Sequence, residues 1–225
     1  AGYAFKAGGG TPSINTDGTR PTIVSVNQAA GFSVFTASTD STSGFLTYGT
    51  GLSQPPELVI YKRTNAAGSW VIASTLLTDY QYLVLNDTAA AVTLGQTIHS
   101  YSNTTFGIRN SYQTSPGYDL LFYAFRSIPG YSKVGSYQGS TNNVSVTTGF
   151  QPTFILVKNT TSAGNWTLWD NKRGGTYFLQ PNNTGLQGSG RTVTFDSNGF
   201  TVDTNGGVNS NSNGDTFIYL AIKEN

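Results

Sequence analysis

One stretch of this sequence occurs twice. Residues 56–74 (PELVIYKRTNAAGSWVIAS) and 152–170 (PTFILVKNTTSAGNWTLWD) share a leading proline, an apolar run, a lysine, a threonine and an Ala-Gly-x-Trp ending. The copies begin at Pro56 and Pro152, 96 residues apart, whereas solenoid repeats have periods of roughly 20–50 residues. Each copy has two apolar runs around a polar loop, which is the pattern of a β-hairpin. The repeat therefore predicts a duplicated unit of sandwich size.

The rest of the chain predicts the same fold class. Short apolar or alternating segments follow one another about every ten residues, with Gly, Asn and Ser turns between them. No segment of a dozen residues has an apolar stripe at the helical period, and the most helix expected is a turn or two, at residues 87–91. We expect an N-terminal strand and linker at 1–21, a first repeat at 22–129 and a second at 130–225. The predicted fold is all-β: two tandem antiparallel β-sandwich units, jelly-roll or concanavalin-like, from an internal duplication.

The composition excludes several classes of partner. Charged residues make up 10% of the chain and the net charge is +1, without a Lys/Arg cluster, which argues against nucleic acid. Cysteine and methionine are absent, so neither a disulfide framework nor a thiolate metal site is available. A chain without sulfur also resists thiol and thioether oxidation, and we expect an extracellular location. No apolar run reaches 18 residues, so no membrane insertion is expected.

Few residues are suited to catalysis. His99 is the only histidine, and no Gly-x-Ser-x-Gly elbow supplies a nucleophile beside it. We expect His99 to be an exposed or hydrogen-bonded loop residue. Glu57 and Glu224 are the only glutamates, and the aspartates mostly lie beside turn residues, where they bend or cap the backbone. A pair of catalytic carboxylates is therefore disfavoured, and we expect a protein that is not an enzyme, with no catalytic residue and no cofactor.

Residues 203–215 carry oxygen-bearing side chains at alternating positions, as calcium-binding loops do. The spacing differs from that of an EF-hand, and the stretch contains no glutamate to act as a bidentate ligand. An ordinary polar loop is the favoured interpretation, and a calcium site is the alternative.

Three tryptophans suit a carbohydrate-binding surface. Trp70, Trp166 and Trp169 offer flat rings on which sugars stack, and the chain is rich in neutral polar residues that bind hydroxyls. Trp70 and Trp166 occupy the same position in the two copies, however. That equivalence favours the alternative that they fill the core beside their hairpins.

The first residues look like the end of a unit. Residues 3–6 (YAFK) recur as YAFR at 123–126 and loosely as LAIK at 220–223, where each copy closes its repeat. We therefore expect residues 3–6 to form a strand, with Tyr3 and Phe5 as its apolar side chains. Such a strand either lies along its own chain or completes the sheet of a neighbouring molecule.

Several motifs together resemble a known class of repeat domain. They lie at residues 4–9, 15–18, 30–33, 130–137, 148–152 and 219–225. These motifs resemble a repeat domain of uncharacterised function in phage tail-fibre-like and other virion structural proteins. That domain often adjoins domains of the concanavalin or laminin-G type. The resemblance covers nearly the whole chain, and it implies a location on the virion surface without implying functional residues.

Three functions remain open from the sequence. The favoured one is a non-enzymatic virion structural protein that packs against copies of itself and other virion proteins and contacts host-surface glycan. The second is an extracellular lectin-like module that binds sugar through its tryptophans. The third is a subunit of a cell-surface filament that donates the strand at residues 3–6 to its neighbour.

Overall fold

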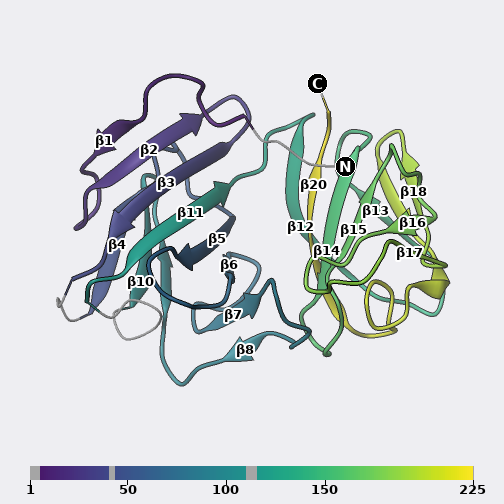
Figure 1. Cartoon of the computed structure of the whole chain (residues 1–225). Coiled ribbons are helices and arrows are strands. Elements are labelled where there is room, and N and C mark those ends of the chain that lie inside the picture. The colour runs from purple at the N-terminus through teal and green to yellow at the C-terminus, as the bar shows by residue number, and fades with distance from the viewer. Residues whose placement is uncertain (1–5, 41–43, 110–115, 225) are drawn as a thin grey trace. The chain divides into compact units, whose positions relative to one another are not determined.

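The computed structural model describes residues 6–40, 44–109 and 116–224 and confirms an all-β chain of antiparallel sheets (Figure 1). The chain divides into two compact units. Unit 1 comprises Ala1–Tyr82 and Val92–Arg126, and unit 2 comprises Leu83–Ala91 and Ser127–Asn225. Within the described residues, no helix is long and apolar enough to cross a membrane.

Unit 1 contains an eight-stranded sheet in the order β1-β2-β3-β11-β5-β6-β7-β8 and a three-stranded sheet in the order β4-β10-β9. Figure 1 shows β3, β11 and β5 side by side in the larger sheet. The bounds are β1 (Ser13–Asn15), β2 (Thr22–Asn27), β3 (Phe32–Ser38), β4 (Phe45–Gly49), β5 (Leu58–Arg63), β6 (Val71–Ser74), β7 (Gln81–Val84), β8 (Val92–Thr93), β9 (His99–Tyr101), β10 (Thr105–Arg109) and β11 (Asp119–Phe125).

Alternating side chains of both sheets form one core in unit 1, as in a β-sandwich. Phe35 of β3 stacks on Phe122 of β11 with ring centroids 4.5 Å apart, and Tyr48 of β4 packs on the same Phe122 at 5.0 Å. Phe106 and Ile108 of β10 complete the opposite side of this core. The core therefore joins the two sheets through aromatic rings.

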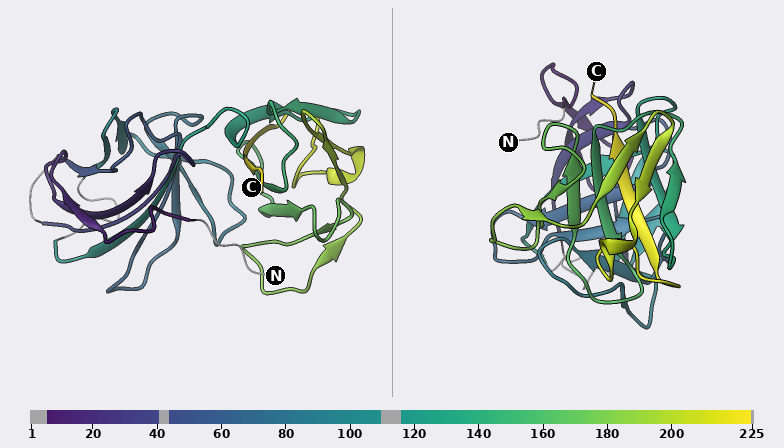
Figure 2. Two further views of the ribbon diagram at one scale, coloured as in Figure 1. Left: turned by 90° about the horizontal axis from the view of Figure 1, so that it is seen from above. Right: turned by 90° about the vertical axis from the view of Figure 1, so that its right-hand side faces the viewer.

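Unit 2 contains a four-stranded sheet in the order β12-β20-β14-β15, a three-stranded sheet in the order β13-β19-β18 and the pair β16-β17. In the right-hand view of Figure 2, β20 is the yellow strand between green neighbours. The bounds are β12 (Ser132–Gln138), β13 (Val144–Thr147), β14 (Phe154–Asn159), β15 (Thr167–Asp170), β16 (Tyr177–Phe178), β17 (Gly188–Ser189), β18 (Val193–Asp196), β19 (Gly199–Val202) and β20 (Thr216–Ile222). One core again combines both sheets, with Tyr137, Phe200, Phe217 and Tyr219 at its centre.

The two units share their strand order. The order β3-β11-β5-β6 in unit 1 corresponds to β12-β20-β14-β15 in unit 2, and β4-β10-β9 corresponds to β13-β19-β18. The two predicted hairpins are confirmed as β5-β6 and β14-β15, and Ile60 pairs with Ile72 just as Leu156 pairs with Leu168.

Three predictions about segments need correction. Residues 1–21 are not simply a linker, because β1 pairs with β2 inside unit 1. Residues 87–91 form no helix, and the 3₁₀ turn among the described residues is η1 (Thr204–Gly206). The unit boundary is also more complex than a single cut near residue 129, because Leu83–Ala91 belongs to unit 2.

Candidate functional site

A polar site of unit 2 is formed where Leu83–Ala91, which we call the strap, packs on the β14-β15 hairpin. The strap begins with the last two residues of β7, whose first two residues belong to unit 1, and it ends just before β8, so both of its ends lead into unit 1. Lys158 and Trp166 hold it, together with the backbone of Thr160 and Gly164, and we call these four residues the unit 2 seat. The site therefore joins a segment of the first half of the sequence to a hairpin of the second half.

Four hydrogen bonds join the unit 2 seat to the strap, and one carbonyl of the strap accepts two of them. The carbonyl oxygen of Thr88 accepts from Lys158 Nζ (2.9 Å) and from the backbone N–H of Gly164 (2.8 Å). The indole Nε1 of Trp166 donates to the carbonyl of Val84 (2.9 Å), and the backbone N–H of Ala91 donates to the carbonyl of Thr160 (3.0 Å). Four hydrogen bonds thus hold the strap along its length.

Lys158 is the unusual residue of this seat, because its side chain is fully buried. Its ammonium also donates to the carbonyl of Gly164, at 2.6 Å. Burial lowers the pKa of Lys158 from 10.5 to about 8, because desolvation disfavours the charged form, while the carboxylate of Asp87 acts in the opposite direction. A cation here is stabilised by two backbone carbonyls and by a strap carboxylate.

Two of the tryptophans predicted to contact glycan are in the interior. Trp166 is 2% exposed and Trp169 is 0% exposed, and Trp169 donates its Nε1 proton to the carbonyl of Arg191. A sugar cannot reach the face of a buried ring, so the glycan prediction is wrong for these two residues. The alternative that Trp166 fills space beside its hairpin is confirmed, with the strap as its cover.

Trp70, the third tryptophan, has a different environment from its equivalent Trp166. It is half-buried in unit 1, its ring lies 5.1 Å from the ammonium of Lys62, and it packs on Tyr123 at 6.2 Å between centroids. Lys62 and Trp70 stand where unit 2 has Lys158 and Trp166. Glycan contact by Trp70 stays a prediction.

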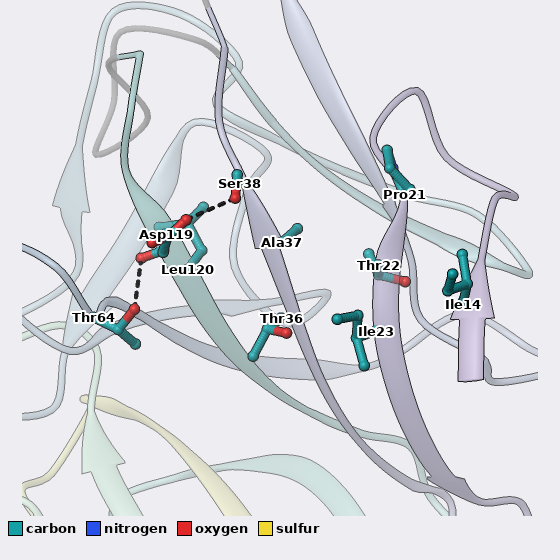
Figure 3. Close-up of a pocket in the computed structure, with 10 residues that line it drawn as sticks. All are labelled: Ile14, Pro21, Thr22, Ile23, Thr36, Ala37, Ser38, Thr64, Asp119 and Leu120. Atoms are coloured by element: carbon teal, nitrogen blue, oxygen red, sulfur yellow. Dashed lines mark hydrogen bonds between the residues drawn. The ribbon is translucent and has the colours of Figure 1, made fainter. Parts of the chain in front are cut away.

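Unit 1 also has a pocket of about 510 Å³ across β1, β2, β3 and β11 (Figure 3). Ile14 and Ile23 form its apolar side and are 76% and 57% exposed. At the other side, Ser38 Oγ donates to the Asp119 carboxylate (2.7 Å), and the Thr64 hydroxyl donates to the Asp119 carbonyl (3.3 Å). The pocket combines an apolar wall with hydroxyl and carboxylate groups, which suits a small amphipathic ligand.

The sequence predicted that His99 lies in a loop, and this prediction is wrong. It begins β9, is 1% exposed, and its Nε2 lies 3.0 Å from the hydroxyl of Tyr61. Burial lowers the pKa of His99 from 6.5 to about 4, partly opposed by a backbone hydrogen bond with Gln81. The expected hydrogen bond is confirmed, and the residue is a neutral core histidine at neutral pH.

In residues 203–215, the carboxylate oxygens of both aspartates accept hydrogen bonds from other groups of the protein. Asp203 accepts from the Thr192 hydroxyl (2.6 Å) and from the backbone N–H of Thr204, and these hydrogen bonds lower its pKa. Asp215 accepts from the amide of Asn159 at 2.8 Å. In the described part of the chain, no group of three or more His, Asp or Glu side chains is placed to hold a metal ion. The polar-loop interpretation fits this arrangement.

Tyr3 and Phe5 lie outside the described residues, so the predicted assembly strand stays a prediction. Neither the strap nor the burial of Lys158 was predicted from the sequence. A signal for the strap exists, because residues 83–88 (LVLNDT) and 179–184 (LQPNNT) share Leu-x-x-Asn-Asp/Asn-Thr. No sequence pattern marked Lys158 as different from Lys62.

A family model described as a domain of unknown function, DUF7483, matches residues 1–225. No curated protein and no solved structure matches the chain.

Proposed function

The chain belongs to the DUF7483 family, and we propose that it is a non-enzymatic structural module of a phage particle, carried in a tail fibre, an appendage or a surface decoration. The place in the particle rests on the resemblance of its sequence motifs to virion structural proteins. The structural role rests on how the two units are built and joined.

The proposal includes an origin of the two β-sandwich units by duplication. Equivalent backbone hydrogen bonds recur at a constant shift of 96 residues in the hairpins: Thr75 N donates to Glu57 O at 3.0 Å, and Asn171 N donates to Thr153 O at 3.0 Å. A corresponding pair of hydrogen bonds links the closing strands: Glu57 N donates to Phe125 O and Thr153 N donates to Ile222 O, both at 2.8 Å, with a shift of 96 residues at the donors and 97 at the acceptors. Shared strand order together with shared loop hydrogen bonds supports one ancestral unit.

The strap is the observation that carries the structural role. It connects consecutive units by more than a linker, because a segment with both ends in unit 1 supplies part of the fold of unit 2. Polar side chains of the types most often used in catalysis make hydrogen bonds within the protein. Lys158 donates to two backbone carbonyls, His99 is within hydrogen-bond distance of Tyr61, and Asp203 accepts from the backbone of its own loop. Such an arrangement favours a protein that transmits load and keeps its shape.

Immunogold electron microscopy tests this proposal. An antibody against the 225 residues is applied to native source material and to purified particles. Gold on particle fibres or surfaces is the expected result. Gold on thin cellular filaments with bare particles contradicts it in favour of the filament function, and label on neither structure contradicts it in favour of a secreted binding module.

A second candidate function, sugar binding, is favoured by the pocket of unit 1 and the half-buried Trp70. The test is a glycan array with the wild-type chain and the variants Asp119→Ser and Trp70→Phe. Binding that is lost in either variant supports this function. Binding to no glycan, or equal binding by all three proteins, contradicts a sugar site at these residues.

A further inference from the structure

The pocket of unit 1 lies on the face of the eight-stranded sheet that points away from the core. Along β3, Ala37 belongs to the core, whereas Thr36 and Ser38 are exposed on the opposite face. Ile23 of β2 is the register partner of Thr36. Asp119 of β11 is the register partner of Ser38. Partners in an antiparallel pair share a face, so these side chains surround one hollow on the outside of the sheet (Figure 3).

Two isoleucines form an apolar wall at one side of the pocket. Ile14 of β1 pairs with Ile23 of β2, so the two side chains are neighbours on the same face. They are 76% and 57% exposed. Single exposed apolar residues are ordinary on protein surfaces, but these two are adjacent and both line a pocket. A ligand with an apolar face would cover them.

The other side of the pocket carries an acidic group without a cationic partner. The Asp119 carboxylate accepts from Ser38 Oγ at 2.7 Å, and it makes no ion pair within the described part of the chain. The basic residues of the neighbouring strand β5, Lys62 and Arg63, instead lie over aromatic rings, at 5.1 Å and 4.5 Å from the ring centroids. A carboxylate without a counter-charge favours a ligand that carries a positive charge.

Hydroxyl groups complete the pocket. Thr36 is exposed, and its hydroxyl makes no hydrogen bond among the residues that the structure describes. The hydroxyls of Ser38 and Thr64 donate to the carboxylate and the carbonyl of Asp119, respectively. A hydroxyl that donates one hydrogen bond can still accept others. Three hydroxyls around one pocket suit a ligand that itself has several hydroxyl groups.

The three features together define a class of ligand. A neutral sugar matches the hydroxyls and the apolar wall, but it leaves the carboxylate without a counter-charge. An alkylammonium ion matches the wall and the carboxylate, but it has no groups for the hydroxyls. An amino sugar matches all three. The pocket volume of about 510 Å³ is within the range of roughly 300–1,000 Å³ that is usual for small-molecule sites.

We propose that this pocket binds a sugar that carries a free ammonium group. The ammonium pairs with the Asp119 carboxylate, and the carbon face of the sugar ring lies against Ile14 and Ile23. The sugar hydroxyls form hydrogen bonds with Thr36 and Thr64. The inference rests on the glycan contact of the proposed function and names the chemical class of the sugar.

One such pocket is expected to bind weakly. Asp119 is exposed, and an ion pair at an exposed site contributes little and is screened by salt. The affinity should therefore fall as the ionic strength rises. Many copies of the chain on one particle would strengthen the attachment through multivalency.

Titration of the full 225-residue chain, followed by the NMR signals of its backbone amides at about pH 6 and low salt, tests the proposal. The probe is a β-1,4-linked tetramer of glucosamine. The matched probe is the glucose tetramer of the same linkage, which has a hydroxyl in place of each ammonium. We expect the glucosamine tetramer to bind at least about threefold more tightly and to shift the signals of Thr36, Ser38 and Asp119. Cyclohexylammonium, which has a ring and a charge without hydroxyls, should bind more weakly than the glucosamine monomer.

Three variants assign the binding to the pocket. Asp119→Asn removes the charge and keeps an oxygen that can accept from Ser38 Oγ, so it should bind the two tetramers alike. Ile23→Thr keeps a β-branched side chain and removes part of the apolar wall, so it should bind both tetramers more weakly. Asp79→Asn makes the same change of charge at an exposed position that does not line the pocket. This control should behave as wild type.

Several results would overturn the inference. Equal affinity of wild type for the two tetramers means that the ammonium is not recognised. A preference that Asp119→Asn retains means that the ammonium binds elsewhere. Cyclohexylammonium bound as tightly as the glucosamine monomer means a site for organic cations and not for a sugar.

The inference and the proposed function can fail separately. Binding to neutral glycans on the array without any preference for the ammonium sugar overturns the inference and leaves the glycan contact standing. Binding of no sugar in either experiment overturns both. Immunogold labelling tests the location on the particle independently of these results.

Discussion

At the scale of single residues, burial determines which ionisable groups affect stability. Lys158 and His99 are both buried, and both have a pKa lowered by desolvation. Each therefore takes up a proton more readily in the unfolded chain, over a range of pH that its two pKa values define. The pH dependence of unfolding reports on each residue in a different range.

Lys158 is predicted to make the protein more stable as the pH rises above 8. Its pKa is about 8 when folded and 10.5 when unfolded, so between these values the unfolded chain binds more protons. The free energy of unfolding should rise by up to about 1.4 kcal/mol for each pH unit. Urea unfolding of wild type at pH 7.5 and pH 9 measures this rise, and comparison with Lys158→Met removes the contribution of tyrosines, whose ordinary pKa is about 10. Lys158→Met should lack this rise, and parallel profiles for the two proteins would contradict the assignment.

His99 is predicted to make the protein less stable as the pH falls. The histidine has a pKa of about 4 when folded and 6.5 when unfolded, so protonation of the unfolded chain begins near pH 6.5. We expect a loss of up to about 1.4 kcal/mol for each pH unit between pH 6.5 and pH 5. The measurement is urea unfolding of wild type and His99→Gln, and the variant should show a flatter profile over this range. Equal slopes for wild type and His99→Gln would mean that groups other than His99 determine the pH dependence of unfolding.

At the scale of elements, the turn at Asp87 in the strap has a counterpart at Asn183 in unit 2, and the contributions of the two turns to stability can be compared. Asp87→Ala removes the acceptor of two backbone N–H groups in the strap, and Asn183→Ala removes the equivalent acceptor, 96 residues later, in the exposed segment 183–187 of unit 2. Asp87→Ala should lower the free energy of unfolding by about 1 kcal/mol, because the strap loses its shaped turn. Asn183→Ala should change it by less than about 0.5 kcal/mol.

Hydrogen exchange of the strap amides separates docking from general instability. Asp87→Ala should speed exchange at Ala91, whose N–H is bound to Thr160 O, and Asp87→Asn should leave it closer to wild type because an amide oxygen still accepts. Unchanged exchange at Ala91 in Asp87→Ala would show that the seat holds the strap without its turn.

Another element-scale prediction concerns the pairing of β12 with β20. Gly135 lies opposite Tyr219, and a Cβ at Gly135 would be 2.5 Å from the Tyr219 hydroxyl oxygen and 2.6 Å from its ring. Gly135→Ala should therefore displace the ring and cost about 1–3 kcal/mol, measured by urea unfolding. Gly95→Ala, where a Cβ meets nothing within 4 Å, is the control. A Gly135→Ala protein as stable as this control would show that Tyr219 moves freely.

At the scale of the whole molecule, the strap predicts coupled unfolding. Loss of unit 1 releases both ends of the strap and exposes the buried Lys158 and Trp166 of unit 2. Phe122→Ala, which removes a central ring of the unit 1 core and should cost about 3–5 kcal/mol, is therefore expected to lower the unfolding midpoint of unit 2 as well. In a Trp70→Phe background, the fluorescence of Trp166 and Trp169 reports on unit 2. An unchanged fluorescence midpoint would show that unit 2 is stable without the strap.

The all-β fold class and the positions of both hairpins could be predicted from the amino-acid sequence, which also shows the 96-residue repeat. These features depend on local alternation, on turn residues and on a repeat that is visible in one dimension, as at Ile60 and Leu156. The surroundings of the equivalent lysines and tryptophans of the two hairpins could not be predicted from the sequence, because they depend on the tertiary structure. Lys62 and Lys158 occupy equivalent positions in the 96-residue repeat, as do Trp70 and Trp166, but the strap covers only the second member of each pair. The strap packs on Lys158 and Trp166, so both side chains are buried and the pKa of Lys158 is lowered. Burial of this kind depends on which distant segment of the chain packs on a residue.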